Sequence, residues 1–218
     1  MLQDLNEISD GKVYGIKDMV RAACSECAGC HACCEAMGNS IVLDPYDVWR
    51  LQEGTGKKFE ELIQGPIELG VEEGLILPHL SMSGKGESCF FLNEEGRCSI
   101  HPYRPGLCRV FPLGRIYEEK QIRYFLQKDA CRKPGRTKVK VEKWLDTPQQ
   151  RKNEKFLLEW HAFRKKMEEK IKQQTDGQAG KTLNLFLLKQ FYITLYKEDG
   201  EFYEQFAKHL EEAEQMEL

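Results

Sequence analysis

Five of the nine cysteines lie within eleven residues, in the segment CSECAGCHACC at residues 24–34. The other four follow singly, as Cys89, Cys98, Cys108 and Cys131. A chain of 218 residues can build its core from apolar side chains and needs no disulfides to fold. Because we see neither a leader segment nor an apolar run of membrane length, we expect a reducing cytoplasm, where clustered cysteines indicate metal or redox chemistry. A disulfide framework is the less favoured alternative.

Charge excludes some classes of partner. The formal net charge is −3 and 31% of the residues are charged, which is ordinary for a globular protein. A balance of this kind gives no general attraction to nucleic acid or to an anionic membrane. We therefore expect no nucleic-acid partner and no membrane partner.

The first cysteine segment contains three CxxC steps in series. The cysteines of these steps are Cys24, Cys27, Cys30 and Cys33. Such a run resembles the loop that wraps a cubane iron–sulfur cluster in bacterial ferredoxins, although there the last spacing is three residues and a proline follows. Zinc also accepts CxxC pairs, usually one from each of two loops. The pattern predicts one or two iron–sulfur clusters, of the 4Fe-4S type, with zinc as the alternative.

Cys33 and Cys34 are adjacent, and neighbouring side chains diverge in an extended segment. We therefore expect one of them to join the loop cysteines and the other to reach Cys89, Cys98, Cys108 or Cys131; one metal would use both only with a sharp local turn. All nine cysteines are candidate metal ligands. They would fill two four-cysteine sites with one left over, or one site with several redox-active thiols.

Four arginines, at positions 97, 104, 109 and 115, surround the later cysteines. Four thiolates on a cubane cluster leave a negative site that needs nearby donors and cations. We expect Arg104 and Arg109 to serve the cofactor in this way, and salt bridges with the many glutamates remain the alternative. His31 and His101 are expected to be hydrogen-bond donors or exposed residues rather than ligands.

Several short elements are predicted before residue 146. A helix should begin at Asp44-Pro45, with Asp44 as its N-cap, and end near Glu53 because Gly54 and Gly56 follow. A short helix is expected at 59–63. Residues 75–80 suit a strand that Pro78 confines to a sheet edge. Nearer the start of the chain, residues 13–16 indicate a strand and 17–23 favour a helix.

Two hairpins are expected. In the first, residues 89–100, apolar stretches flank an Asn-Glu-Glu-Gly connection. If Leu92 lies opposite Arg97, alternation puts Cys89, Phe91 and Cys98 on one side of the ribbon. The second hairpin is expected at residues 115–127.

Apolar residues with helical spacing predict three helices after Pro148, at about 149–173, 182–196 and 202–210. Thr182 would cap the second helix, and residues 173–180 would form a polar linker. The fold class is then α+β: a loop-rich, cysteine-ligated metal domain with short hairpins at 1–146, followed by a helical region at 147–218. These helices should pack on the metal domain or form a homo-oligomer.

The CxxCxxCC pattern from Cys27 to Cys34, followed by CFFLNEEGRCSIHPYRPGLCRVFP, resembles the YkgJ-like cysteine-cluster family. That family is described as a zinc- or iron-chelating domain. The resemblance implies metal-binding roles for Cys27, Cys30, Cys33, Cys34, Cys89, Cys98 and Cys108. Cys131 matches a later cysteine of the family, and Cys24 is an addition to its pattern. The family includes a flagellin lysine methylase, so the resemblance also allows a role in methyl transfer.

Together these patterns predict an iron–sulfur protein that acts in electron transfer or supports a redox or methyl-transfer partner. The alternative is a zinc-binding interaction module without catalysis. Motifs of hydrolases, zinc proteases and nucleotide-binding enzymes are missing from the sequence. The sequence leaves open whether the protein is an enzyme.

Overall fold

The computed structural model describes residues 5–23, 30–84, 87–131, 135–174, 177–194, 196 and 201–215. Helices and short antiparallel strands alternate along the chain, so the fold is α+β as predicted. The helices are α1 (Leu5–Ile8), α2 (Pro45–Thr55), α3 (Phe59–Leu62), α4 (Gly106–Val110), α5 (Val141–Leu145), α6 (Gln150–Gln173), α7 (Gly177–Leu188) and α8 (Phe202–Gln215). The strands are β1 (Ser9–Tyr14), β2 (Met19–Ala23), β3 (Ile67–Glu72), β4 (Leu75–Leu80), β5 (Leu113–Tyr117), β6 (Ile122–Gln127) and β7 (Thr137–Lys140).

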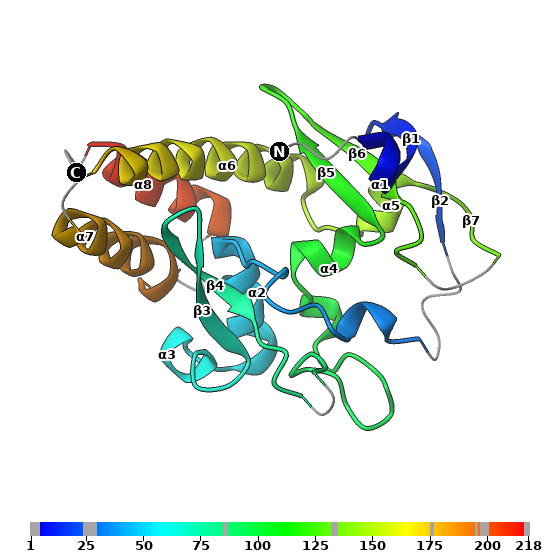
Figure 1. Ribbon diagram of the computed structural model, residues 1–218, viewed down its shortest axis with the longest axis horizontal. Helices are drawn as coiled ribbons and strands as arrows, with labels where there is room; N and C mark the ends of the chain where they lie inside the picture. The colour runs from blue at the N-terminus through cyan, green and yellow to red at the C-terminus, as the bar shows by residue number, and fades with distance from the viewer. Residues whose placement is uncertain are drawn as a thin grey trace.

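Figure 1 shows the arrangement of these elements. Helices α6, α7 and α8 gather on one side of the molecule, and strands β1, β5 and β6 lie on the other. The β3–β4 hairpin and α2 stand between them, with α4 on the side toward β5. The loops that carry most of the described cysteines lie below α4 in this view.

The first strands of the chain pair with strands from far along it. Strand β1 is antiparallel to β6 in a sheet of order β1-β6-β5, and β2 is antiparallel to β7. The prediction of a helix at 17–23 was therefore wrong. In β2 the side chains of Val20 and Ala22 are buried and their neighbours are not, which is the alternation of a strand; pairing with β7 decides the conformation. This pairing brings Ala23 opposite Thr137.

The hairpin predicted at 115–127 is confirmed by β5 and β6, which pair from Leu113–Leu126 to Tyr117–Ile122. The strand at 75–80 is also confirmed, as β4. Its partner is β3, and Pro78 lies opposite Leu69. These two strands form a two-stranded sheet, so Pro78 does stand in an edge strand.

Helix α2 begins as predicted. Asp44 and Asp47 form a capping box, in which each carboxylate accepts a hydrogen bond from the other residue's N–H. The helix continues through Gly54 and ends at Gly56, whose φ of 67° suits glycine. Glycine at position 54 does not end the helix; it leaves room for a neighbouring ring, because a Cβ there would lie 2.6 Å from the ring of Tyr103.

The C-terminal region is helical as predicted, but the start of α7 and the linker before it differ from the prediction. Helix α6 matches the predicted span, and α8 buries Phe202 and Phe206. Helix α7 begins at Gly177, before the predicted start, and Thr182 lies inside it, where its hydroxyl donates to the Gln178 carbonyl. The helix continues as a π-helical turn over Lys189–Ile193. The predicted linker is thus shorter, and residues 175–176 of it lie outside the described residues.

Aromatic packing joins the helices to the rest of the chain. The ring of Tyr46 in α2 lies 5.1 Å from that of Phe202 and 6.2 Å from that of Phe156. The Tyr192 hydroxyl donates to the Leu43 carbonyl at 3.1 Å. The buried side chains of both regions form one continuous cluster, so the helices pack on the cysteine region. The division at residue 146 stays a prediction. Across the described chain, no helix has the length and apolar character to span a membrane.

Candidate metal centre

Backbone pairing ties the cysteine pair at residues 33–34 to Cys89. Residues Ala32–Cys34 form one 3-10 turn, in which the Cys34 N–H donates to the His31 carbonyl at 2.7 Å. The Cys34 carbonyl then accepts from the Cys89 N–H, also at 2.7 Å. Because of this turn the pair is not extended, so the premise that its two side chains diverge does not hold.

The segment around Cys89 and Cys98 turns back on itself as predicted, with the Ser99 N–H donating to the Phe91 carbonyl at 2.9 Å, but it contains an isolated bridge rather than two strands. Its one bridge joins Leu92 to Cys98, whereas the prediction placed Leu92 opposite Arg97. The register slips by one residue because the Asn93 side chain accepts a hydrogen bond from the Arg97 N–H at 2.8 Å, which includes Arg97 in the turn. The predicted alternation of side chains along two strands therefore does not occur.

Cys108 lies in the short helix α4. The first residue of this helix, Gly106, is hydrogen-bonded to two side chains. The Gly106 N–H donates to Asp47 Oδ1 at 2.7 Å, and the Gly106 carbonyl accepts from Arg115 at 3.2 Å. Asp47 thus connects the start of α2 to the helix that holds Cys108. Nothing local in the sequence indicates that Asp47 has a partner at residue 106, so this link was not predicted.

Five thiols converge from these segments. They belong to Cys33, Cys34, Cys89, Cys98 and Cys108, and each alters the pKa of at least one other. A hydrogen bond from the Cys34 thiol, with help from the charge of Arg104, lowers the pKa of Cys33 to about 7. The same hydrogen bond raises the pKa of Cys34, and burial raises the pKa of Cys89, Cys98 and Cys108. Without a cation, Cys33 is therefore expected to be about half ionised near pH 7, and the other four thiols neutral.

The donor set fits a thiophilic metal. Cys89 is buried and the other four thiols of this group are partly buried, and thiolate sulfur is the preferred ligand of zinc and of iron–sulfur clusters. The thiols are not preset around one point: among the described residues, no three Cys, His, Asp or Glu side chains stand ready to hold an ion. A metal would deprotonate these thiols and draw them together, which couples binding to local ordering.

The remaining predicted ligands are distributed as follows. Cys30 and Cys131 are described and partly buried, but no described interaction connects them to the five converging thiols. Cys24 and Cys27 lie outside the described residues. The predicted ligand set as a whole stays a prediction.

The chain was also compared with known proteins. Residues 26–142, more than half of the chain, match the model of the CxxCxxCC family, whose description reads "Putative zinc- or iron-chelating domain". The chain belongs to this family. No curated protein and no solved structure matches it. The CxxCxxCC domain therefore includes all three segments that bring the thiols together.

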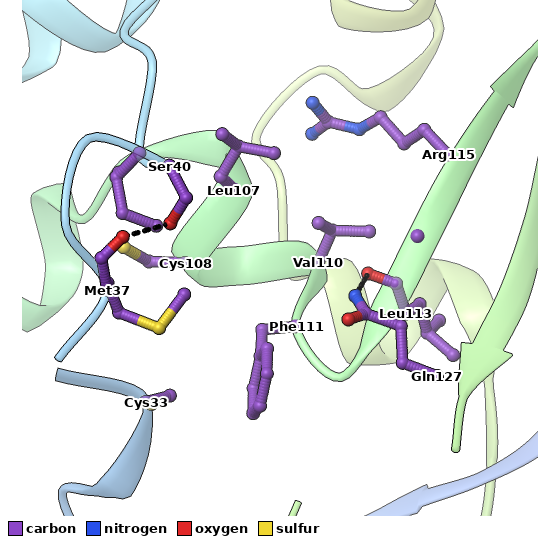
Figure 2. A pocket seen from close by; sticks show the side chains of 12 residues that line it. Cys33, Met37, Ser40, Leu107, Cys108, Val110, Phe111, Leu113, Arg115 and Gln127 are labelled. Atoms are coloured by element: carbon purple, nitrogen blue, oxygen red, sulfur yellow. Dashed lines mark hydrogen bonds between the residues drawn. The ribbon is translucent and has the colours of Figure 1, made fainter. Parts of the chain in front are cut away.

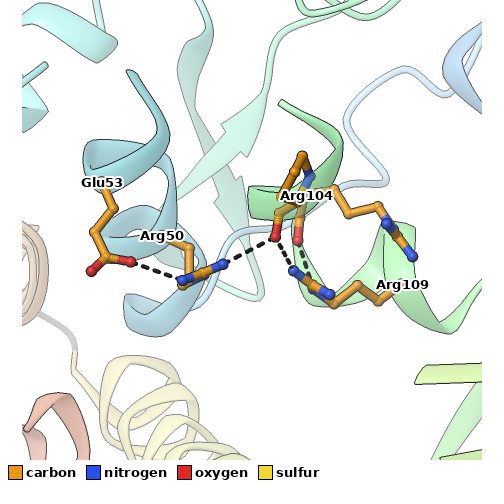
Figure 3. A network of polar contacts seen from close by, with 5 residues as sticks. Arg50, Glu53, Arg104 and Arg109 are labelled. Atoms are coloured by element: carbon orange, nitrogen blue, oxygen red, sulfur yellow. Dashed lines mark hydrogen bonds and ion pairs between the residues drawn. The ribbon is translucent and has the colours of Figure 1, made fainter. Parts of the chain in front are cut away.

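The two predicted cofactor arginines of the CxxCxxCC domain differ in their surroundings. Arg104 is bonded to His101, and its charge favours the thiolates of Cys33 and Cys98. Arg109 is buried; it donates to the carbonyls of Pro102 and Arg104 (Figure 3) and also to the carbonyl of Asp146. Arg109 therefore holds the backbone before α4, and the cofactor roles of both arginines stay predictions.

A cavity of about 220 Å³ opens beside the thiols of this domain. Figure 2 shows Cys33 and Cys108 on one side of it, with Met37 between them and Phe111 nearby. Its other walls are mostly apolar, and Ser40, Gln127 and Arg115 supply the polar groups. Sequence analysis missed this cavity because its walls come from segments far apart in the chain.

Proposed function

We propose that the CxxCxxCC domain binds one or two iron–sulfur clusters, of the 4Fe-4S type, in a reducing cytoplasm. The protein would act in electron transfer or support a redox or methyl-transfer partner protein. The observation that carries this proposal is the convergence of five thiols from the turn at Ala32–Cys34, the loop at 89–98 and helix α4. Such a donor set favours soft metal centres over magnesium or calcium, which prefer oxygen ligands.

Iron–sulfur chemistry is favoured by the supply of thiols and by charge. The five converging cysteines exceed the four that one cluster requires, and the serial CxxC segment supplies more. Arg104 places a positive charge that favours two of the thiolates, as a negatively charged cluster needs. The cluster would supply one-electron transfer, while the chain would hold it, limit its contact with water and set its charge environment.

Zinc remains the second candidate, for a specific reason. Between Glu87 and Arg104 the backbone forms turns, isolated bridges and a short 3-10 helix, with no strand. A tetrahedral zinc ion could hold these turns to α4 without any redox role, and α7 or α8 would then recruit a partner.

Metal and acid-labile sulfide analysis of protein purified without oxygen tests the proposal. We expect iron and sulfide in equal amounts, with broad absorbance near about 400 nm. Zinc without iron or sulfide would contradict the cluster and favour the structural zinc site. Protein that contains neither metal, and in which all nine thiols react freely, would contradict metal binding altogether.

A matched pair of variants tests the ligand set. Cys108→Ser replaces a converging thiol by a hydroxyl, and we expect it to lower metal content per chain by at least about half. Met37→Leu changes the same cavity wall without removing a thiol, so its metal content should equal that of the unmodified chain. Equal metal content in both variants would exclude Cys108 as a ligand.

The partner proposals have separate tests. A redox partner protein should be reduced or oxidised by the metal-loaded chain in a direct assay. A role in methyl transfer requires a methyl donor, and calorimetry that detects no binding of such a donor would exclude it. A homo-oligomer through the C-terminal helices would have to use their exposed side chains, since the apolar face of α7 is buried within this chain.

A further inference from the structure

A buried histidine in strand β4 is the feature from which we argue, independently of the thiols. His79 is 1% exposed, and its Nδ1 lies 2.6 Å from the carbonyl oxygen of Asn39. Because a carbonyl oxygen only accepts, Nδ1 carries the ring proton and donates it. Nε2 of the neutral ring then presents a lone pair. Among the described residues Nε2 has no hydrogen-bond partner, and a buried polar atom of this kind calls for a ligand.

The pairing of β3 with β4 directs this nitrogen toward a glutamate. His79 lies opposite Glu68 in the ladder, and alternation places Glu68, Gly70 and Glu72 on the same face of the hairpin as the ring. The ring lies over Gly70, since a Cβ there would be 2.8 Å from Nε2. Beyond Gly70, Oε1 of Glu72 lies 3.7 Å from Nε2. A nitrogen and an oxygen that both accept therefore face each other, at a distance too long for a hydrogen bond.

The separation of these two atoms suits a shared cation. Zinc binds an imidazole nitrogen at about 2.0–2.1 Å and a carboxylate oxygen at about 2.0–2.2 Å, which holds two such ligands about 3.0–3.5 Å apart. Glu72 would have to approach His79 by less than about 1 Å, and its side chain, which is 43% exposed, has room to do so. The same exposure gives an ion a route to the buried nitrogen.

The surroundings of the pair are those of metal ligands. A ligating histidine usually donates its other ring N–H to a carbonyl or a carboxylate, as His79 does to Asn39. Glu68, the second carboxylate on this face, accepts from the buried Ser81 hydroxyl at 2.5 Å. Within the described part of the chain no three such side chains already surround one point, so Glu68 would join by rotation of its side chain. Water would fill the remaining positions around an ion.

We propose that His79 and Glu72 bind a zinc ion, with Glu68 as a further carboxylate ligand. The donor set differs from that of the thiol centre, because imidazole and carboxylate groups replace sulfur. The ion would join β3 to β4, and through the ring of His79 it would also hold the backbone at Asn39. A proton bound between His79 and Glu72 is the competing explanation.

Zinc binding by the full chain, followed by equilibrium dialysis, tests the site. The cysteines also bind metal under the proposed function, so the measured quantity is the difference between variants. Glu72→Gln should shift the binding of one zinc per chain to at least about tenfold higher free zinc, because a charged ligand is lost. Glu73→Gln is the matched control: it makes the same change in the next residue, which pairs with Lys172 at 2.7 Å, and should leave the curve unchanged. An unchanged curve for Glu72→Gln, or equal shifts in both variants, would overturn the proposal.

Nuclear magnetic resonance identifies the ligand. The ring signals of His79, assigned by their loss in His79→Gln, should shift when zinc is added to the unmodified chain and to Glu73→Gln. At the same zinc concentration they should not shift in Glu72→Gln. Cys108→Ser should keep the zinc-dependent shift, so failure of the thiol centre and failure of this site are distinguishable. Ring signals that follow pH and never zinc would show a bound proton and overturn the proposal, as would a shift that Cys108→Ser abolishes.

Discussion

Cys33 and Cys34 are adjacent, yet their thiols differ in acidity. The 3-10 turn lets the Cys34 thiol donate to the Cys33 sulfur, which stabilises the Cys33 thiolate and disfavours that of Cys34. The Cys33 sulfur can thus bind a cation as a thiolate near neutral pH. The Cys34 thiol must lose its proton when the cation binds. A single backbone turn, rather than the residue types, produces this difference.

The acidity of Cys33 predicts a pH dependence in the metal-free protein. Because its pKa is lowered to about 7, its thiolate persists down to about pH 7 and is lost below it. Iodoacetamide labelling of Cys33, followed by peptide mass spectrometry, should therefore rise through a midpoint near pH 7. Cys34→Ala removes the hydrogen bond and should move the midpoint upward, and Arg104→Gln should move it less. A midpoint that neither variant changes would contradict this assignment.

Gly54 gives a second prediction at the scale of one residue. Alanine normally stabilises a helix interior by about 1 kcal/mol relative to glycine. At this position its Cβ would lie 2.6 Å from Tyr103, so we expect Gly54→Ala to lower the free energy of unfolding by about 1–3 kcal/mol. Gly180→Ala, in α7, meets only the end of the Gln174 side chain at 3.7 Å and should raise it by about 0.5–1 kcal/mol. Urea denaturation of both variants in the same metal state tests this contrast.

Among the elements, α2 and α4 are the pair that positions a predicted ligand. The N-terminus of α2 provides the Asp47 carboxylate, which both closes the capping box and accepts from Gly106. Burial raises the pKa of Asp47, while these hydrogen bonds and the charge of Arg115 oppose that effect. Asp47, which completes the cap of α2, therefore also anchors helix α4, which carries Cys108.

Removing that anchor should affect both stability and metal binding. We expect Asp47→Ala to lower the free energy of unfolding by about 2–4 kcal/mol, since two hydrogen bonds to a buried carboxylate are lost. Metal content should fall as well, because α4 loses its fixed start. Glu53→Ala breaks a surface ion pair of the same helix with Arg50 and should change stability by less than about 1 kcal/mol. Similar losses in the two variants, measured by denaturation, would contradict the anchoring role.

At the scale of the whole molecule, one core serves both regions of the chain. Phe156 of α6 is 2% exposed and contacts Tyr46 of α2 as well as Phe206 of α8. The C-terminal helices thereby cover the helix whose first turn positions α4. The metal region and the helices should therefore unfold together.

Phe156→Ala tests this coupling. Removal of a buried aromatic ring should lower the free energy of unfolding by about 3–5 kcal/mol. Far-ultraviolet circular dichroism and the reactivity of the cysteines should report the same unfolding midpoint, shifted equally. Leu185→Ala, at a position 69% exposed, should shift neither. Separate midpoints for the two signals would show that the helical region folds independently.

Local patterns in the sequence were sufficient for elements whose cause is local. The helix start with Asp44 as N-cap, the helical periodicity of α6 and the hairpin of β5 and β6 each arise from neighbouring residues, and all three were predicted. The cysteine spacing likewise indicated a metal-binding family, which the family comparison confirmed. Short-range sterics and hydrogen bonds act before the chain has folded, so such features can be identified without a structure.

Tertiary contacts decided the rest. Strand β2 forms because β7 pairs with it, and Asp47 acquires its role from a residue 59 positions away. Sequence alone therefore determined the α+β class and the membership of a cysteine-cluster family described as zinc- or iron-chelating. The three-dimensional structure determined which thiols meet, because long-range pairing brings distant segments together only when they share one core.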